Sequence, residues 1–565
     1  MTETTGDAAR LKLSRSTGDA DARLKPSRST GRSALLVAAG ILCSRLAGLV
    51  RQRVIAHYFG LTTDAADAWA AGFRIPNFLQ NLFGEGALSA SFIPIYAALL
   101  ARGERREADR VASGVGALLA LVVSGIVLTG VVATPWLIGA IAPGFTGAKR
   151  ELTVTVVRIL FPGAGLLVMS AWCLGILNSH HRFLLSYAAP VIWSASMIVA
   201  LLWFGAGTAL PRLVAILAWS SVVGSALQFG IQIPVVLRVA PHLGLAPWRG
   251  AFTPPRDALS ASKVGHAGVQ AVVSNFVPAF FSRGVVQVSA YIDTLLASLL
   301  PTGAVAGLTN AQVLYTLPVS LFGMSVAAAE LPAMSGVSAD TDGADVLRLR
   351  LDSGLRRIAY FVIPSAVAFL ALGDIVAAAL LQTGRFRHED AVYVWGILAG
   401  SAVGLLASTL GRLYSSTYYA LRDTGTPMRY AIVRVVLTTV LGYLFAIPLP
   451  RLLGVPPAWG AAGLTSSAGM AGWVEMLLLR ATLNARIGRT GLPAAYLAKL
   501  WGAASIAAAV AWGSKLATPA LHPAVTAILV LGPYGAVFVA MTFAMRVPEA
   551  SSVFVRFTRR KRIRN

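Results

Sequence analysis

The chain has 565 residues, of which 56% are hydrophobic and only 13% are charged, and its mean hydropathy is +0.68. These values exclude an ordinary soluble globular protein and indicate a membrane protein. Lys and Arg outnumber Asp and Glu by 48 to 24, an excess that suits nucleic acid, anionic lipid or an anionic substrate. Where the positive residues lie along the chain decides among these three.

Residues 1–33 form a hydrophilic leader that contains a short duplication, GDAARLKLSRSTG followed by GDADARLKPSRSTG. Its composition predicts a disordered basic tail. Contact with anionic lipid is one interpretation, and a solvated topology signal is the simpler one. Because the first apolar run begins near Ala34 without a signal-like region before it, the first helix is expected to act as its own insertion signal.

Apolar runs of about 20 residues, long enough to span a bilayer, follow one another as far as residue 545. They predict about fourteen helices, near 34–58, 65–100 (broken), 110–133, 152–178, 183–205, 213–237, 265–299, 305–333, 357–381, 390–418, 428–449, 457–480, 495–516 and 523–545. The expected fold class is therefore all-α, a polytopic membrane protein.

A linker rich in Pro and charge, 238–264, separates the first six helices from the rest. The expected N-terminal lobe is 34–237. The C-terminal lobe, together with its outlying portal helices, is 265–545, and a basic tail, 546–565, ends the chain.

An even number of helices places both termini on the same side of the membrane. The loops richest in Lys and Arg fall on that side too, and they are the leader, 101–110, 238–263, 336–357 and the tail. The positive-inside rule identifies this side as the cytoplasm. Most of the positive excess therefore sets topology, and no nucleic-acid partner is needed to explain it.

Gly and Pro interrupt many of the predicted helices, as in RIPNF, LFPGAG, NFVPAF, YTLPVS and FVIPSA. In lipid, a broken backbone is tolerated where it is buried in protein or lines a wet cavity. The breaks favour a transporter over a plain helical scaffold.

Charges inside the predicted helices are a sharper signal, because each costs several kcal/mol at the bilayer centre unless it is paired or faces water. The first helix carries Arg45, about 16 Å deep, and Arg51, about 25 Å deep. The second helix adds Asp67, Arg74 and Glu85. Something in the folded protein must stabilise these charges.

The seventh predicted helix adds Arg283 and Asp293. A cavity that holds several arginines suits an anion, and the guanidinium fork suits phosphate in particular. We expect Arg45, Arg74 and Arg283 to line such a cavity, whereas the acids are expected mainly as counter-ions of the cations.

Arg51 lies near the end of the first helix with Arg53 and His57, where an anchor at the membrane interface is the default interpretation. No Walker-type loop, metal-ligand spacing or nucleophile elbow accompanies these residues. We therefore expect no catalytic residue, metal or cofactor, and transport would draw on a gradient or on the membrane potential.

Several stretches of the chain resemble the MurJ/MviN family of lipid II flippases, which belong to a superfamily of multidrug, oligosaccharidyl-lipid and polysaccharide exporters. They are SRLAGLVRQRVIAHYFG, DAWAAGFRIPNFLQNLFGEGALSASFIPIY, ILNSHHRF, LLQTGRF and STYYALRDTGTP. The resemblance implies fourteen helices in two lobes around a cationic cavity, in the bacterial inner membrane, with both termini cytoplasmic.

The resemblance also implies site residues, and these match in part. The family's charged positions are retained at Arg45, Arg51, Asp67, Arg74 and Glu85. Cations expected of the family are absent at Gln80, Asn81, Gln312 and Val313, and an acid is absent at Gln52. Together with Asn77, the amides of Gln80 and Asn81 can donate hydrogen bonds to phosphate or sugar, but they supply no charge.

The function that the resemblance implies is transfer of a polyprenyl-diphosphate-linked peptidoglycan precursor, lipid II, from the cytoplasmic to the outer leaflet for cell wall synthesis. The partners would be this anionic lipid, membrane lipids and cell wall synthesis proteins. A paralogue that flips another lipid-linked glycan, a non-transporting scaffold and an exporter of small drugs are the alternatives.

Overall fold

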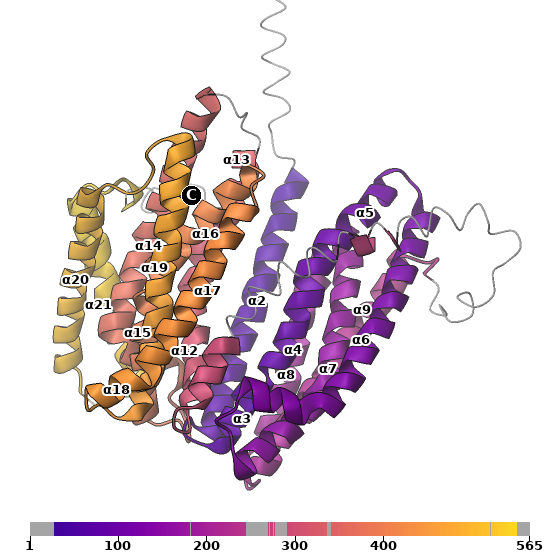
Figure 1. The fold of residues 1–565 in the computed structure, drawn as a ribbon, viewed down its shortest axis with the longest axis horizontal. Coiled ribbons are helices and arrows are strands. Elements are labelled where there is room, and N and C mark those ends of the chain that lie inside the picture. Colours follow the sequence, from indigo (N-terminus) through magenta and orange to yellow (C-terminus); the bar gives the residue numbers. More distant parts are fainter. Residues whose placement is uncertain are drawn as a thin grey trace, which may run out of the picture.

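The computed structural model describes residues 28–180, 182–243, 269–270, 272–274, 276, 291–335, 341–519 and 521–550. In this part of the chain the secondary structure is helical, apart from one isolated bridge between Thr383 and Phe386. Figure 1 shows two bundles, one of N-terminal helices and one of C-terminal helices, with α2 between them.

The N-terminal bundle consists of α2 (Arg28–Phe59), α3 (Asp64–Gly72), α4 (Arg74–Leu79), η1 (Gln80–Leu88), α5 (Ser89–Ala101), α6 (Arg105–Ile141), α7 (Gly147–Ser179), α8 (Phe183–Phe204) and α9 (Leu210–Val239). Helix α7 packs against α9, α6 and α3, and α8 packs against α2 and α9.

The C-terminal bundle consists of α12 (Ala304–Pro318), η2 (Val319–Met324), α13 (Ser325–Ser335), α14 (Thr341–Leu381), α15 (His388–Ala402), α16 (Leu405–Ala420), α17 (Gly425–Ala446), α18 (Pro448–Leu452), η3 (Pro457–Trp459), α19 (Gly460–Ile487), α20 (Ala494–Ala517) and α21 (Pro523–Ala544). The last two helices lie at the outer edge of this bundle, against α14 (Figure 1).

Among the described residues, eight helices are long and apolar enough to cross a membrane, and α15 with α16, bent by 44° at their junction, makes a ninth candidate. Each predicted range except 265–299 coincides with a helix or a broken helix. The all-α polytopic fold is confirmed. The total of fourteen stays a prediction, because 265–299 lies mostly outside the described residues.

One predicted loop is partly wrong. The stretch 336–357 was expected to be a cytoplasmic loop, but α14 already begins at Thr341. Leu347, Leu351 and Leu355 recur every four residues and are buried. This spacing places them on one face of a helix, so the charged residues between them occupy the opposite face.

The second predicted helix is broken as the sequence indicates. Thr63 caps α3 by accepting a hydrogen bond from the backbone N–H of Ala66 at 3.2 Å. The helix ends at Gly72, and Arg74 begins a new short helix whose Pro76 lacks an N–H group. A π-helical segment, η1, follows over QNLFGEGAL, and such segments are rare and concentrate at functional sites.

Glycine allows a close approach between backbones in the C-terminal bundle. A Cβ atom added to Gly404, at the bend between α15 and α16, would lie 2.3 Å from the Cα atom of Gly469 in α19. Because the obstacle is backbone, no side-chain rotation could relieve the clash.

Gly404→Ala is therefore expected to separate α19 from the bend and to lower the free energy of unfolding by about 1–3 kcal/mol. Thermal unfolding of the purified protein in detergent measures this loss. Gly472→Ala in α19 is the matched control, since no atom lies within 4 Å of the added Cβ there. Equal melting temperatures for the two variants would contradict the close approach.

Candidate functional site

The predicted site residues that the structure describes lie on five elements. They are Arg45 and Arg51 on α2, Asp67 on α3, Arg74 and Asn77 on α4, Gln80, Asn81 and Glu85 on η1, and Asp293 on the helical segment 291–298. Two of the predictions cannot be placed: Arg283 and the side chain of Glu85 lie outside the described part of the chain.

Asp67 joins the two bundles. Its carboxylate is 1% exposed and accepts hydrogen bonds from the backbone N–H groups of Gly303 and Ala306, each at 2.9 Å. These groups belong to the first turn of α12, where N–H groups have no partner within the helix and the helix dipole favours an anion. Lys149, at the start of α7, completes the arrangement with its Nζ 2.5 Å from Asp67 Oδ2.

A second set of contacts ties the end of α2 to the end of α14. The Arg53 guanidinium donates to the carbonyl groups of Ala379 (2.8 Å) and Leu380 (3.0 Å), and His57 Nδ1 lies 2.9 Å from the Thr383 hydroxyl. Arg53 and His57 thus both contact the opposite bundle, and their position at the membrane interface stays a prediction. We call these contacts and those of Asp67 with α12 the interbundle junction.

Gln52, which stands where the family carries an acid, adds a neutral contact close to this junction. Its Nε2 donates to Asn310 Oδ1 of α12 at 2.8 Å, and both side chains are buried. Asn310 in turn donates to the carbonyl of Ala306 at 3.0 Å. Two amides thus satisfy each other across the bundles without a buried charge.

Arg51 is held inside the N-terminal bundle. Its guanidinium lies 5.0 Å from the Phe73 ring and 5.1 Å from the Trp193 ring, and it donates to the Ser194 hydroxyl at 3.4 Å. Cation–π contacts of this kind stabilise a desolvated guanidinium. Arg51 therefore packs against aromatic residues in this conformation, and its role as an interfacial anchor stays a prediction.

Arg45 has a different environment. It is exposed, as are Leu42, Leu46 and Val50 on the same half of α2. No described residue makes a hydrogen bond or ion pair with the Arg45 side chain. At this level α2 carries a cation that the described part of the chain leaves exposed.

Asp293 lies within electrostatic range of two arginines, Arg74 from the N-terminal bundle and Arg434 from α17. Arg434 also forms an ion pair with Glu475 of α19, with 3.1 Å between Nη1 and Oε2. The expectation that Asp293 serves as a counter-ion is consistent with these neighbours. They also connect the bundles through charge.

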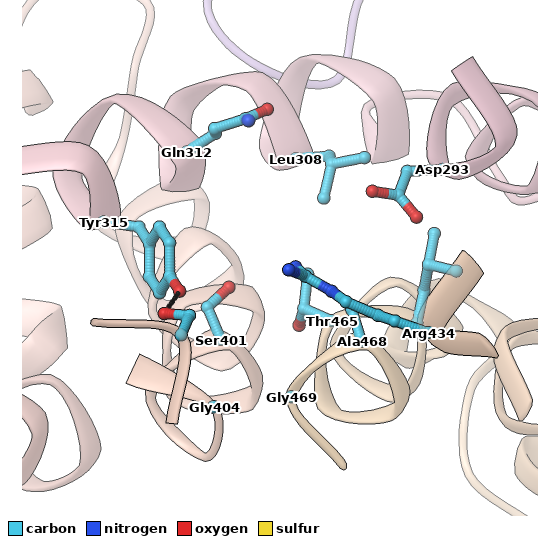
Figure 2. Close-up of a pocket in the computed structure, with 12 residues that line it drawn as sticks. Asp293, Leu308, Gln312, Tyr315, Ser401, Gly404, Arg434, Thr465, Ala468 and Gly469 are labelled. Atoms are coloured by element: carbon cyan, nitrogen blue, oxygen red, sulfur yellow. Dashed lines mark hydrogen bonds between the residues drawn. The ribbon is translucent and has the colours of Figure 1, made fainter. Parts of the chain in front are cut away.

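Asp293 and Arg434 line a cavity of about 150 Å³ in the C-terminal bundle. Figure 2 shows the guanidinium end of Arg434 among the lining side chains, with Tyr315 on one side and Asp293 on the other. Gln312, at one of the positions where the family's cation is absent, lines the same cavity.

Lys149, Arg434 and Glu475 form ion pairs in the structure but are not among the site residues predicted from the sequence. Arg434 and Glu475 lie within predicted helices, 428–449 and 457–480. Charged residues inside spanning helices are costly, and this criterion, which identifies the charges of the first two helices, also applies to them. Lys149 precedes a predicted helix and looks like an ordinary loop cation. Nothing in its local sequence indicates a partner in α3.

One stretch that carries the family resemblance builds a turn. In STYYALRDTGTP, Asp423 accepts hydrogen bonds from the backbone N–H of Thr426 (2.9 Å) and from its hydroxyl (2.7 Å), and Arg486 donates to the same carboxylate at 2.8 Å. The two hydrogen bonds from Thr426, followed by Arg486, lower the pKa of Asp423 to about 2. This residue positions the start of α17.

Lys149→Met should leave the Asp67 carboxylate buried without its cation, which we expect to lower the free energy of unfolding by about 3–5 kcal/mol. The double variant Asp67→Asn with Lys149→Met removes both charges. It should melt at a higher temperature than Lys149→Met alone. Thermal unfolding in detergent measures both, and a double variant less stable than Lys149→Met would show that the charges are not coupled.

Comparison with known proteins adds to this geometry. The profile of the family described as "Lipid II flippase MurJ" matches residues 55–532. A Burkholderia cenocepacia protein named "Lipid II flippase MurJ" is 32% identical over 80% of this chain and 84% of its own length. A Vibrio cholerae protein named "Probable lipid II flippase MurJ" is 27% identical over 85% of this chain and 91% of its own.

Solved structures support the fold. One described as "Lipid II flippase MurJ, inward closed conformation" superposes with a TM-score of 0.71 and 21% identity over 93% of this chain and 99% of that one. An inward-facing multidrug resistance transporter of the MATE family superposes less closely, with a TM-score of 0.61 and 18% identity over 80% of this chain and 98% of its own. The chain is thus a multi-pass membrane protein that belongs to the MurJ family.

Proposed function

We propose that this protein flips a polyprenyl-diphosphate-linked peptidoglycan precursor, lipid II, from the cytoplasmic to the outer leaflet by alternating access. The proposal rests on family membership and on relatives that carry the name lipid II flippase over most of their length. The two lobes, 34–237 and 265–545, would be the parts that move.

The interbundle junction is the observation that carries the mechanism. Under the predicted topology its residues lie at the outer end of the helices, so the contacts of Asp67 and His57 close the outer side. Exposed Arg45 lies near the middle of α2, two to three turns closer to the inner end than Arg53 and His57. An exposed cation below a closed outer end suits loading of an anionic lipid from the inner leaflet.

The direct test is rescue of a bacterium whose own lipid II flippase is switched off, with outer-leaflet lipid II as the readout. This chain should restore both growth and labelled lipid II outside. Growth without labelled lipid II would favour a paralogue with another lipid-linked glycan. Absence of both growth and labelled lipid II would favour a scaffold.

Within that assay, Arg45→Gln should abolish rescue, and Arg45→Lys should rescue weakly because an ammonium group loses the bidentate fork. Arg212→Gln is the control, since Arg212 is an exposed arginine at the start of α9, away from the proposed site. Full rescue by Arg45→Gln at normal membrane abundance would refute a binding role.

Both termini are proposed to be cytoplasmic, and two single cysteines test this in a protein without Cys43 and Cys173. A cysteine in place of Thr302 should react with an impermeant thiol reagent added outside the cell, because the loop before α12 is predicted to lie outside. A cysteine in place of Asp345 should remain unlabelled until the membrane is permeabilised. The reverse pattern would overturn the topology.

A further inference from the structure

We propose that Arg434 of α17 is a substrate-binding residue that contacts an anionic group of the transported lipid. It would supply, from another helix, the cation that this chain lacks at Gln312 and Val313 of α12. The inference rests on the proposed flippase function and names a residue of its binding site.

The position of Arg434 is the first observation. Arg434 and Gln312 line the same cavity of about 150 Å³, and Gln312 is exposed. In Figure 2 the Arg434 side chain extends across the lining residues, and its guanidinium ends below Leu308. A cation from α17 thus reaches the wall of α12 where the family's cation is absent.

The hydrogen-bonding capacity of Arg434 is the second observation. A guanidinium has five N–H donors. Glu475 accepts at Nη1, and no other hydrogen bond to the Arg434 side chain occurs among the described residues. The Arg434 side chain is 39% exposed, whereas that of Glu475 is 16% exposed. Glu475 therefore orients the guanidinium and leaves most of its donors to face the cavity.

The electrostatic neighbours are the third observation. Asp293 interacts with Arg434 and also with Arg74 of the N-terminal bundle, and its Oδ1 atom is buried without a hydrogen-bond partner in the described structure. Asp293 thus balances a guanidinium from each bundle. An incoming anionic group would pair with Arg434 in place of Asp293, and Asp293 would remain beside Arg74. Each guanidinium would then still have an anion next to it.

A purely structural ion pair between Arg434 and Glu475 is the competing explanation. Such a pair is costly to keep inside a membrane and can often be replaced by apolar residues without loss of stability. The structural explanation makes one clear prediction: exchanging the two charges should preserve everything that the pair does.

The test compares five proteins: wild type, Arg434→Gln, the exchanged pair Arg434→Glu with Glu475→Arg, the relocated cation Arg434→Gln with Gln312→Arg, and the control Arg429→Gln. Arg429 is exposed on the same helix and does not line the cavity. The readouts are the melting temperature and the binding of purified polyprenyl diphosphate and of lipid II in detergent.

Arg434→Gln should weaken lipid II binding at least tenfold, while Arg429→Gln leaves it unchanged. The exchanged pair keeps an ion pair between positions 434 and 475 but places a carboxylate beside Asp293, so it should melt somewhat below wild type and bind as weakly as Arg434→Gln. The relocated cation should recover most of the affinity. Weakened binding of polyprenyl diphosphate as well identifies the diphosphate as the partner of Arg434. Weakened binding of lipid II alone identifies a carboxylate of the peptide.

Wild-type affinity in Arg434→Gln, or in the exchanged pair, would overturn the proposal. Should Arg434→Gln fold poorly, Arg434→Lys replaces it: a structural charge would keep full affinity, whereas a bidentate contact would lose part of it. Because these experiments measure binding, their results do not depend on the outcome of the rescue assay. A wild-type chain that binds lipid II through Arg434 but does not flip it would refute the proposed function alone.

Discussion

The Asp67 carboxylate is carried by one bundle and bound by the first turn of a helix in the other. Buried carboxylates are costly unless they are paired and hydrogen-bonded, and here Lys149 and the N–H groups of Gly303 and Ala306 meet both needs. Lys149 starts α7, which packs against α3, so Asp67 and Lys149 would move together. Separation of the bundles would break the contacts with α12 while the ion pair persists. The charge therefore stays compensated in both states, which keeps the closed arrangement reversible.

The remaining charges divide into two groups by environment. Arg51 packs against aromatic rings and Arg53 donates to carbonyl groups at a helix end, so both stabilise the bundles in this conformation. Arg45 and Arg434 keep guanidinium donors that no described residue uses. In an apolar chain, cations left this way are expected to have a ligand or water as their partner. If both bind anions as proposed, Arg45 would do so from α2, which lies between the bundles, and Arg434 from the wall of the C-terminal cavity.

Hydropathy alone predicted the helices, because spanning segments must be long and apolar and their breaks carry Gly and Pro. The break at RIPN and the retained charges of the first two helices could also be read from the sequence. What could not be read was which groups meet. The partners of Asp67 are a loop-end lysine and two backbone N–H groups, about 80 and 240 residues away, and backbone donors carry no sequence signal. The sequence predicts α14 too short, because the charged face of its first turns has the composition of a cytoplasmic loop.

The central claim is that the interbundle junction must open for the lipid to cross. His57 and Thr383 meet across it at 2.9 Å, so cysteines at these two positions can be joined by a short reducible thiol cross-linker in a protein without Cys43 and Cys173. Flipping is then measured in vesicles before and after reduction. The cross-linked protein should stay folded, stop flipping and resume flipping when the link is reduced. Flipping at the full rate by completely cross-linked protein would contradict the claim.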